Sequence, residues 1–277
     1  MVSGRLTRLT ARTLVYGLLI VFGIVMVVPF LWMFSASFKP LAEVIRVPPT
    51  WIPENVTLTN YQVVWIEFRF FRYFANSVIV AMVTVLFVLT TSSMAGYALA
   101  KFDFGGKDVI FILILSSLMV PFQTRLIPLY QLTTGLGLAD TLAGVIFPWI
   151  VDAFGIYLMR QFIMSIPSDL IEAARIDGAG ELRIFLQIVI PLVRPALSAL
   201  AILTLVVNWE EFLWPLVITS SDASRTLPVG LQSFAEQYAA NTHWQMAGAS
   251  IAILPLIVVF LIFQRHFIRG IAMTGLK

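Results

Sequence analysis

Six long apolar segments restrict the fold of this chain more than any other feature. Each holds about 20 or more residues, the length that an α-helix needs to cross the hydrocarbon core of a bilayer. They occupy residues 14–34, 74–100, 108–130, 141–164, 196–219 and 247–268. Because lipid offers the backbone no hydrogen-bond partners, an isolated segment of this length satisfies its own groups only as a helix. We therefore expect an all-α integral membrane protein with six transmembrane helices, forming a single domain over residues 1–277.

The composition agrees with a membrane protein and excludes several functions. Hydrophobic residues make up 59% of the chain and charged residues 12%, against about 25% charged in soluble domains. Cysteine is absent, so disulfides, thiolate metal sites and cysteine nucleophiles are excluded. The net charge of +3 is small and lacks the clustered basic face that nucleic-acid binding needs. The expected surroundings are membrane lipid, not nucleic acid.

The distribution of basic residues predicts the orientation. Cytoplasmic segments carry an excess of Lys and Arg, and twelve basic residues fall on one side of the predicted helices against six outside or embedded. Both termini and the 165–195 loop are therefore expected in the cytoplasm. The apolar run after Arg12 is too long for a secretory signal and predicts an uncleaved first helix. The outer loops are 35–73, whose proline-rich part is expected to be rigid and extended, and 220–246.

The 165–195 loop has the pattern of two helices separated by a glycine. Ser168 is expected to cap the first helix, and Asp169 and Glu172 lie in its opening turns, where acidic side chains suit the helix dipole. Gly178 supplies the stop, because glycine readily adopts the left-handed conformation that ends helices. Apolar residues then recur on one face of a second helix, at Leu182, Phe185, Ile188 and Val189.

This loop resembles the EAA motif of ABC importer permeases. The matching residues are Glu172-Ala173-Ala174, Asp177-Gly178-Ala179 and Ile190-Pro191-Leu192. The resemblance implies the type I ABC importer permease fold, in which this loop forms a coupling helix that sits in a cleft of a cytoplasmic ATPase subunit. It also implies that the residues coupling to the ATPase are Glu172, Ala173, Ala174, Asp177, Gly178, Ala179 and Pro191, while Leu182, Phe185 and Ile188 anchor the loop to the helix bundle.

Polar residues inside the apolar segments are candidates for a substrate pathway, because charge at membrane depth is costly. The fifth segment carries Asn208, Glu210 and Glu211 beside Trp214, and tryptophan next to hydrogen-bonding groups suits sugars. The alternative is an interfacial aromatic belt, with the acidic side chains reaching the membrane surface. Asp152 is a further pathway candidate, or it forms a buried pair with Arg125 that fixes helix packing.

Three more segments resemble the sugar-importing branch of the family, of the maltose and oligosaccharide type (carbohydrate uptake family 1). They are residues 208–216, similar to N-x-F-x-W-P-L with one extra residue, residues 73–77, similar to F-x-N-S, and the tail 269–277. The resemblance implies a bacterial inner-membrane protein that works with a second permease, two ATPase subunits and an extracytoplasmic sugar-binding protein. Importers of glycerol phosphate or other polar solutes look similar and remain an alternative.

The sequence contains no catalytic set of its own. It has no phosphate-binding G-x-x-x-x-G-K-[ST] loop, so we expect no bound cofactor, and ATP would be used by the partner subunits. His243 and His266 lie far apart and have no metal-ligand spacing, so no metal is expected. A proton-coupled transporter using Glu210, Glu211 or Asp152 is the rival hypothesis, although it leaves the 165–195 loop unexplained.

Overall fold

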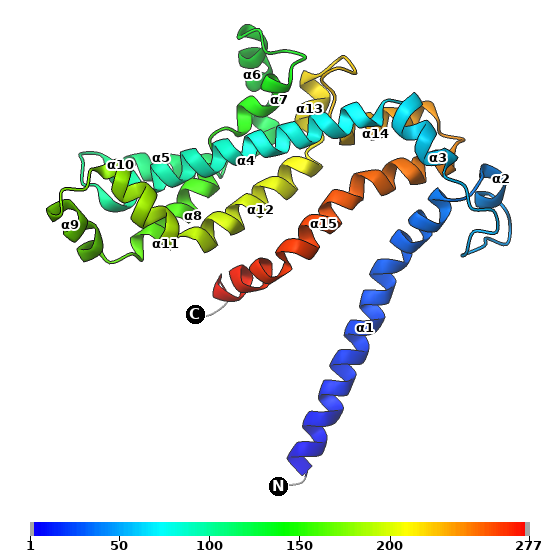
Figure 1. Ribbon diagram of the computed structural model, residues 1–277, viewed down its shortest axis with the longest axis horizontal. Helices are drawn as coiled ribbons and strands as arrows, with labels where there is room; N and C mark the ends of the chain where they lie inside the picture. Colours follow the sequence, from blue (N-terminus) through cyan, green and yellow to red (C-terminus); the bar gives the residue numbers. More distant parts are fainter. Residues whose placement is uncertain (1–2, 275–277) are drawn as a thin grey trace. The chain divides into compact units, whose positions relative to one another are not determined.

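The computed structural model describes the backbone of residues 3–274 and the side chains of residues 12–264. Every regular element in that part of the chain is a helix, which confirms the all-α prediction (Figure 1). In chain order these are α1 (Ser3–Ser37), α2 (Leu41–Val44), α3 (Thr59–Gln62), η1 (Val63–Glu67), α4 (Phe70–Lys101), α5 (Lys107–Ser117), α6 (Phe122–Gly135), α7 (Leu142–Ile146), η2 (Phe147–Trp149), α8 (Ala153–Met164), α9 (Ser168–Ile176), α10 (Glu181–Ile184), η3 (Phe185–Val189), α11 (Ile190–Leu192), α12 (Arg194–Glu210), α13 (Leu213–Ile218), α14 (Leu227–Gln237) and α15 (Thr242–Thr274).

The chain forms two compact units. Unit 1 holds the residues up to Phe70 together with Leu231–Leu254, and unit 2 holds Phe71–Gly230 with the residues from Pro255 onward. Unit 1 contains α1. The most apolar 18 residues of this helix, within Arg12–Ser37, are not buried against any other part of the chain. Such a helix needs lipid or another protein chain around it.

The loop of unit 1 that follows α1 is folded back on itself. The carboxylate of Glu43 accepts hydrogen bonds from the backbone N–H groups of Glu54 (2.8 Å) and Asn55 (3.1 Å). These bonds lower the pKa of the Glu43 carboxyl, and the bond from the Glu54 N–H has the largest effect. The Lys39 side chain is fully buried, with its ammonium 4.8 Å from the ring centroid of Trp32. The expectation of an extended proline-rich segment was wrong, because buried charged groups bend it around themselves.

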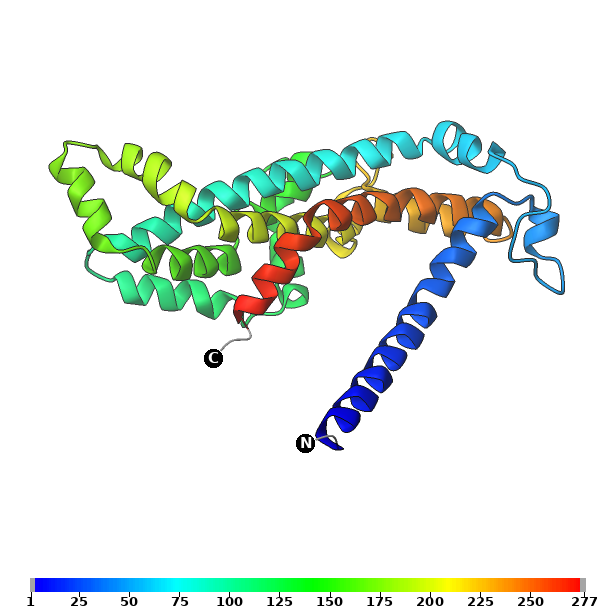
Figure 2. The ribbon, with the colours of Figure 1, turned by 60° about the horizontal axis from the view of Figure 1, so that its bottom comes forward.

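Unit 2 is built around two apolar cores. The larger core joins α4, α8 and the 165–195 region to α12, with Val88, Tyr97, Met159, Ile163, Ile171, Ile184 and Leu200 among its buried members. The second core lies around α7 and α13 and contains Val80, Val145, Ile146, Trp214 and Ile218. Figure 2 shows α9, α10 and α11 (green to yellow-green) at one end of unit 2, beside the C-terminal end of α4.

Within residues 12–264, three helices are long and apolar enough to cross a membrane unaided, at Arg12–Ser37, Phe70–Lys101 and Thr242–Gln264. Three further candidates are helix pairs that bend at a short break. The α5–α6 pair bends by 101°, the pair of Leu142–Trp149 with α8 by 46°, and the pair of Glu181–Leu192 with α12 by 78°. Pro121 lies at the first of these breaks, whereas Pro128 and Pro255 lie inside continuous helices.

Asp140 clamps the loop after α13 to the loop before α7. Its backbone N–H donates to the Ile218 carbonyl (2.8 Å). Its Oδ1 accepts the N–H groups of Ser220 (2.9 Å) and Ser221 (3.0 Å), and also the Ser224 hydroxyl. These donors hold the pKa of the Asp140 carboxyl well below its usual range, and the Ser221 N–H has the largest effect.

The start of α4 holds the same loop from another side. The Asn76 amide donates to the carbonyls of Ala223 (3.0 Å) and Arg225 (2.8 Å), and the Leu227 N–H donates to the Ser77 hydroxyl (2.8 Å). The loop between α13 and α14, the loop before α7 and the first turns of α4 therefore meet at one end of unit 2.

Replacing Asp140 with asparagine is expected to lower the free energy of unfolding by about 1 kcal/mol, because charge-assisted hydrogen bonds become neutral ones. The wild-type carboxyl has a lowered pKa in the fold. Its stabilisation is therefore present above the unfolded pKa of about 4 and lost as the pH falls through the folded value. Thermal unfolding at pH 7 and in acid measures the difference. The control is Asp103→Asn, which changes a fully exposed carboxylate. If the two variants lost the same unfolding free energy at pH 7, the stabilising role of the Asp140 hydrogen bonds would be contradicted.

Candidate coupling surface and transport pathway

Helix α9 is formed by a short segment whose charges suit its ends. Asp169 lies in the first turn and Arg175 in the last, each at the pole of the helix dipole that stabilises it. The helix starts directly after Pro167, and no side chain caps it. The prediction that Ser168 caps α9 was wrong, because this serine is already the first helical residue, and its hydroxyl instead lies 3.5 Å from the Lys101 ammonium.

Gly178 ends α9, as the sequence predicts, in a complete Schellman motif. It adopts the left-handed conformation, with φ of +80°. Its N–H donates to the Arg175 carbonyl (3.0 Å), and the Ala179 N–H donates to the Ala174 carbonyl (2.9 Å). These two bonds satisfy carbonyl groups that the helix end leaves open, so the direction in which the chain leaves α9 is fixed.

The residues matching the EAA motif divide between an exposed and a packed face. Glu172, Ala173, Asp177 and Gly178 are exposed. Ala174 and Ala179 instead pack against the larger core of unit 2. Ile176, which sequence reasoning passed over, is 86% exposed beside Asp177. Glu172 and Ile176 are four residues apart, so both lie on the same exposed side of α9.

Glu181 anchors α9 to the end of α4. Its carboxylate accepts a hydrogen bond from the Tyr97 hydroxyl (2.8 Å) and pairs with the Arg175 guanidinium (2.6 Å). The pKa of Arg175 is raised, and its hydrogen bond to Glu181 is the largest cause. Arg175 also lies over the Phe102 ring, 5.8 Å from its centroid. Sequence reasoning missed this anchor because Tyr97 and Glu181 are 84 residues apart.

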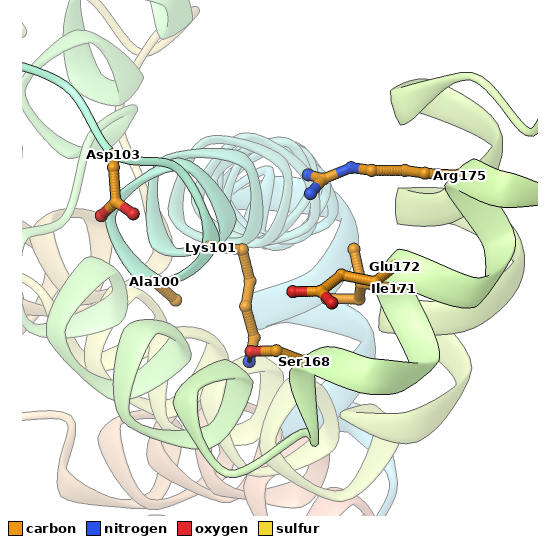
Figure 3. A pocket seen from close by; sticks show the side chains of 7 residues that line it. All are labelled: Ala100, Lys101, Asp103, Ser168, Ile171, Glu172 and Arg175. Atoms are coloured by element: carbon orange, nitrogen blue, oxygen red, sulfur yellow. Dashed lines mark hydrogen bonds between the residues drawn. The ribbon is translucent and has the colours of Figure 1, made fainter.

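A polar cavity of about 230 Å³ lies between α9 and the end of α4. Figure 3 shows Glu172 and Arg175 reaching from α9 toward α4, with Lys101 reaching in the opposite direction toward Ser168. The Lys101 ammonium donates to the Ile166 carbonyl (2.5 Å). Charged side chains of both signs therefore line the space between α9 and α4.

The second helix of the loop contains a π-helical turn that changes its packing face. Phe185 and Val189 are buried and Ile188 packs against the core, as predicted. The anchoring role predicted for Leu182 was wrong, because its side chain is 69% exposed and Ile184 is buried instead. The wider turn at η3 shifts the register of the apolar residues relative to a regular α-helix. Pro191 lies in the first positions of α11, where its missing N–H is tolerated.

The polar residues of the fifth apolar segment surround the break between α12 and α13. The Asn208 amide donates to the Thr204 carbonyl of its own helix (2.9 Å), and Glu210 is exposed. Glu211 accepts the Trp214 N–H (3.1 Å). The Trp214 ring is fully buried, and its Nε1 donates to the Gly144 carbonyl (3.0 Å). A contact of these residues with substrate stays a prediction.

Asp152 and Arg125 line the same cavity, which has a volume of about 400 Å³. Asp152 caps α8, accepting the N–H groups of Phe154 (3.3 Å) and Gly155 (2.8 Å). Within residues 12–264, whose side chains the structure describes, Arg125 takes part in no ion pair. The buried Arg125–Asp152 pair is therefore not formed, and both groups face a shared space.

Residues 92–273 match the family of binding-protein-dependent transport system inner membrane components. This match covers well over half of the chain, so the chain belongs to that family of membrane permeases. The resemblance to ABC importer permeases is thereby confirmed, as is the location in the inner membrane.

The sequence similarity to several transport permeases extends over almost the whole chain. The arabinooligosaccharides transport system permease protein AraQ of Bacillus subtilis is 38% identical over 252 residues, which are 90% of each chain. AraQ of Halalkalibacterium halodurans is 41% identical over 91% of each chain. The sn-glycerol-3-phosphate transport system permease protein UgpE of Brucella abortus is 33% identical, over 94% of this chain and 96% of its own.

A solved structure has the same fold. A chain from the crystal structure of a bacterial ABC transporter that imports the acidic polysaccharide alginate matches with a TM-score of 0.82 and 27% identity. The match covers 92% of this chain and 95% of the other.

Proposed function

We propose that this chain is the permease subunit of an ATP-driven importer that translocates a saccharide delivered by an extracytoplasmic binding protein. The observation that carries the proposal is α9, whose exposed face bears Glu172, Ala173 and Asp177 and whose other face is fixed to α4 through Glu181. A short helix rigidly attached to a membrane helix is what a separate ATPase needs in order to move the bundle. Two relatives named for arabinooligosaccharides and a structural neighbour that imports alginate support a saccharide as cargo.

Six crossings with both termini in the cytoplasm are part of this proposal, and contacts within unit 2 support the alternation of the four crossings from α4 to α13. The loops before α7 and after α13 meet at Asp140, together with the first turns of α4. In the six-helix topology these three segments all lie outside. The last turn of α4 meets α9 through Lys101, and both of these are cytoplasmic in the same topology.

The mechanism follows from differential affinity. Two cytoplasmic ATPase subunits bind ATP and close, and α9 moves with them as a lever. This permease and a second, similar one then change from an inward-open to an outward-open arrangement, which accepts the saccharide from the binding protein. ATP drives the change only because the closed ATPase pair binds one arrangement better than the other. The chain itself binds no ATP and no cofactor in this scheme.

The test is uptake by the complex in proteoliposomes, with the second permease, the ATPase subunits and the binding protein present. Labelled arabinotriose is expected to enter only when ATP is hydrolysed, and the loaded binding protein is expected to stimulate the ATPase. Uptake of glycerol 3-phosphate in place of the saccharide would favour the alternative that the UgpE relatives suggest. Uptake driven by a proton gradient, without ATPase subunits, would refute the proposal and establish a secondary transporter.

A further inference from the structure

Two bent helix pairs of unit 2 meet at one cavity. Its volume is about 400 Å³, within the range of about 300–1,000 Å³ that small-molecule sites have. The α5–α6 pair breaks there at Pro121, and the pair that ends in α8 breaks there at Asp152. Breaks at membrane depth are tolerated where they are enclosed by protein or line a wet cavity, and discontinuous helices commonly build the substrate sites of transporters.

An aromatic platform forms one side of the cavity. The rings of Phe122 and Trp149 are stacked, with centroids 5.1 Å apart and planes at 23°. Trp214 supports Phe122 edge-on, at 6.4 Å and 87°, from within the second core. Both rings are half-buried and line the cavity. Because Phe122 is contacted by Trp149, Trp214 and Arg125, the outer face of Trp149 is the aromatic surface left for the apolar face of a sugar ring.

Polar groups lie beside the platform. The Arg125 guanidinium is 5.8 Å from the Phe122 ring centroid and offers five N–H donors. Asp152 uses each carboxylate oxygen for one backbone N–H, and each oxygen has a second lone pair for a hydroxyl group. An acyl chain in this cavity would offer no polar partner to the Arg125 guanidinium or to the remaining lone pairs of Asp152, which is costly in a membrane.

We propose that this cavity binds one ring of the transported saccharide, with the ring face on Trp149, which Phe122 backs from its other side, and the hydroxyl or carboxylate groups at Arg125 and Asp152. The inference rests on the proposed function and deepens it by assigning a place to the cargo. Trp214 then acts as a positioning residue for Phe122 and does not touch the sugar.

The absence of native cysteine allows a direct test of occupancy on this chain. Ser117 lines the cavity, whereas the neighbouring Ser116 does not, and both are exposed. Their hydroxyls make equivalent hydrogen bonds to carbonyls three residues earlier, at 2.7 Å and 2.8 Å. Ser117→Cys and Ser116→Cys are therefore a matched pair for labelling with a methanethiosulfonate reagent in the complete complex, with binding protein and ATP.

At an arabinotriose concentration about ten times the dissociation constant, labelling of the Ser117→Cys variant is expected to slow about tenfold, with no change for Ser116→Cys. Adding Trp149→Ala or Arg125→Gln is expected to raise the arabinotriose concentration needed for protection, about fivefold for the loss of stacking. The aromatic control is Tyr130→Ala, because Tyr130 lies on α6 with Arg125 but does not line the cavity.

Uptake of arabinotriose without protection of Ser117→Cys would overturn this inference and leave the proposed function standing. Failure of the unmodified complex to take up any saccharide would refute the proposed function, and this inference with it. Equal protection at both serines would also overturn the inference, because it would indicate a general conformational change and not occupancy of the cavity.

Discussion

Replacing Gly178 with proline is expected to reduce ATP-driven uptake to background while the complex still assembles in the membrane. The residue has φ of +80°, which proline cannot adopt, and its N–H makes the 3.0 Å bond to the Arg175 carbonyl that proline would remove. Proline at an incompatible position costs about 3 kcal/mol or more, a hundredfold change in the population of the native turn. Without the turn, α9 keeps its sequence but loses its fixed direction relative to α4.

The readouts separate coupling from folding. Expression and co-purification of the partner subunits are expected to be close to wild type, because Gly178 is exposed and a Cβ there would meet no other atom within 4 Å. ATPase activity should lose its stimulation by the loaded binding protein. The control is Gly180→Pro, two residues away, where φ of −71° already suits proline. Gly178→Pro with wild-type uptake would refute a lever role for α9, and equal loss in both variants would show a general sensitivity of the loop.

Glu172→Lys tests the same lever through charge. Glu172 lines the polar cavity with Lys101 and Arg175, so a lysine there would place three cations around one small space. The expected result is again loss of coupled uptake with normal insertion. Glu172→Gln, which keeps the shape without the charge, is expected to retain more uptake than the lysine variant.

The parts of the fold that local sequence determines were predictable. The three unbroken candidate spans follow from long apolar runs, and the stop at Gly178 follows from the one residue type that readily takes positive φ. The exposed face of α9 follows from its short polar pattern. These features depend on residues within a few positions of each other.

The parts that depend on distant partners or on helix irregularity could not be predicted. Nothing near Glu181 points to Tyr97, and the π-helical turn that exposes Leu182 and buries Ile184 leaves the apolar spacing looking regular. The break before α8 falls in an apolar stretch, so hydropathy continues across it. The Arg125–Asp152 ion pair that the sequence suggested is not formed, because Asp152 caps α8, although both residues line one cavity.

Replacing Gly96 with leucine is expected to prevent the permease from accumulating in a folded form. A Cβ at this position of α4 would lie 2.8 Å from the Met159 Cβ and 2.9 Å from the backbone nitrogen of Arg160. Both contacts are with α8, one of them with its backbone, so rotating a side chain cannot relieve them. Overpacking typically costs about 1–3 kcal/mol, and the upper end or beyond is expected here because the backbone cannot move aside and the site borders the larger core, where Met159 is fully buried.

The measurement is the yield of monodisperse complex after detergent extraction, together with its unfolding temperature. Gly135→Leu is the matched control, since it also lies in a helix and a Cβ there would meet nothing within 4 Å. Met159→Gly is not expected to rescue Gly96→Leu, because the clash with the Arg160 backbone remains. A normal yield for Gly96→Leu would mean that α4 and α8 do not approach this closely. The anchoring of α9 would then need another explanation, because Tyr97 follows Gly96 directly on the same helix.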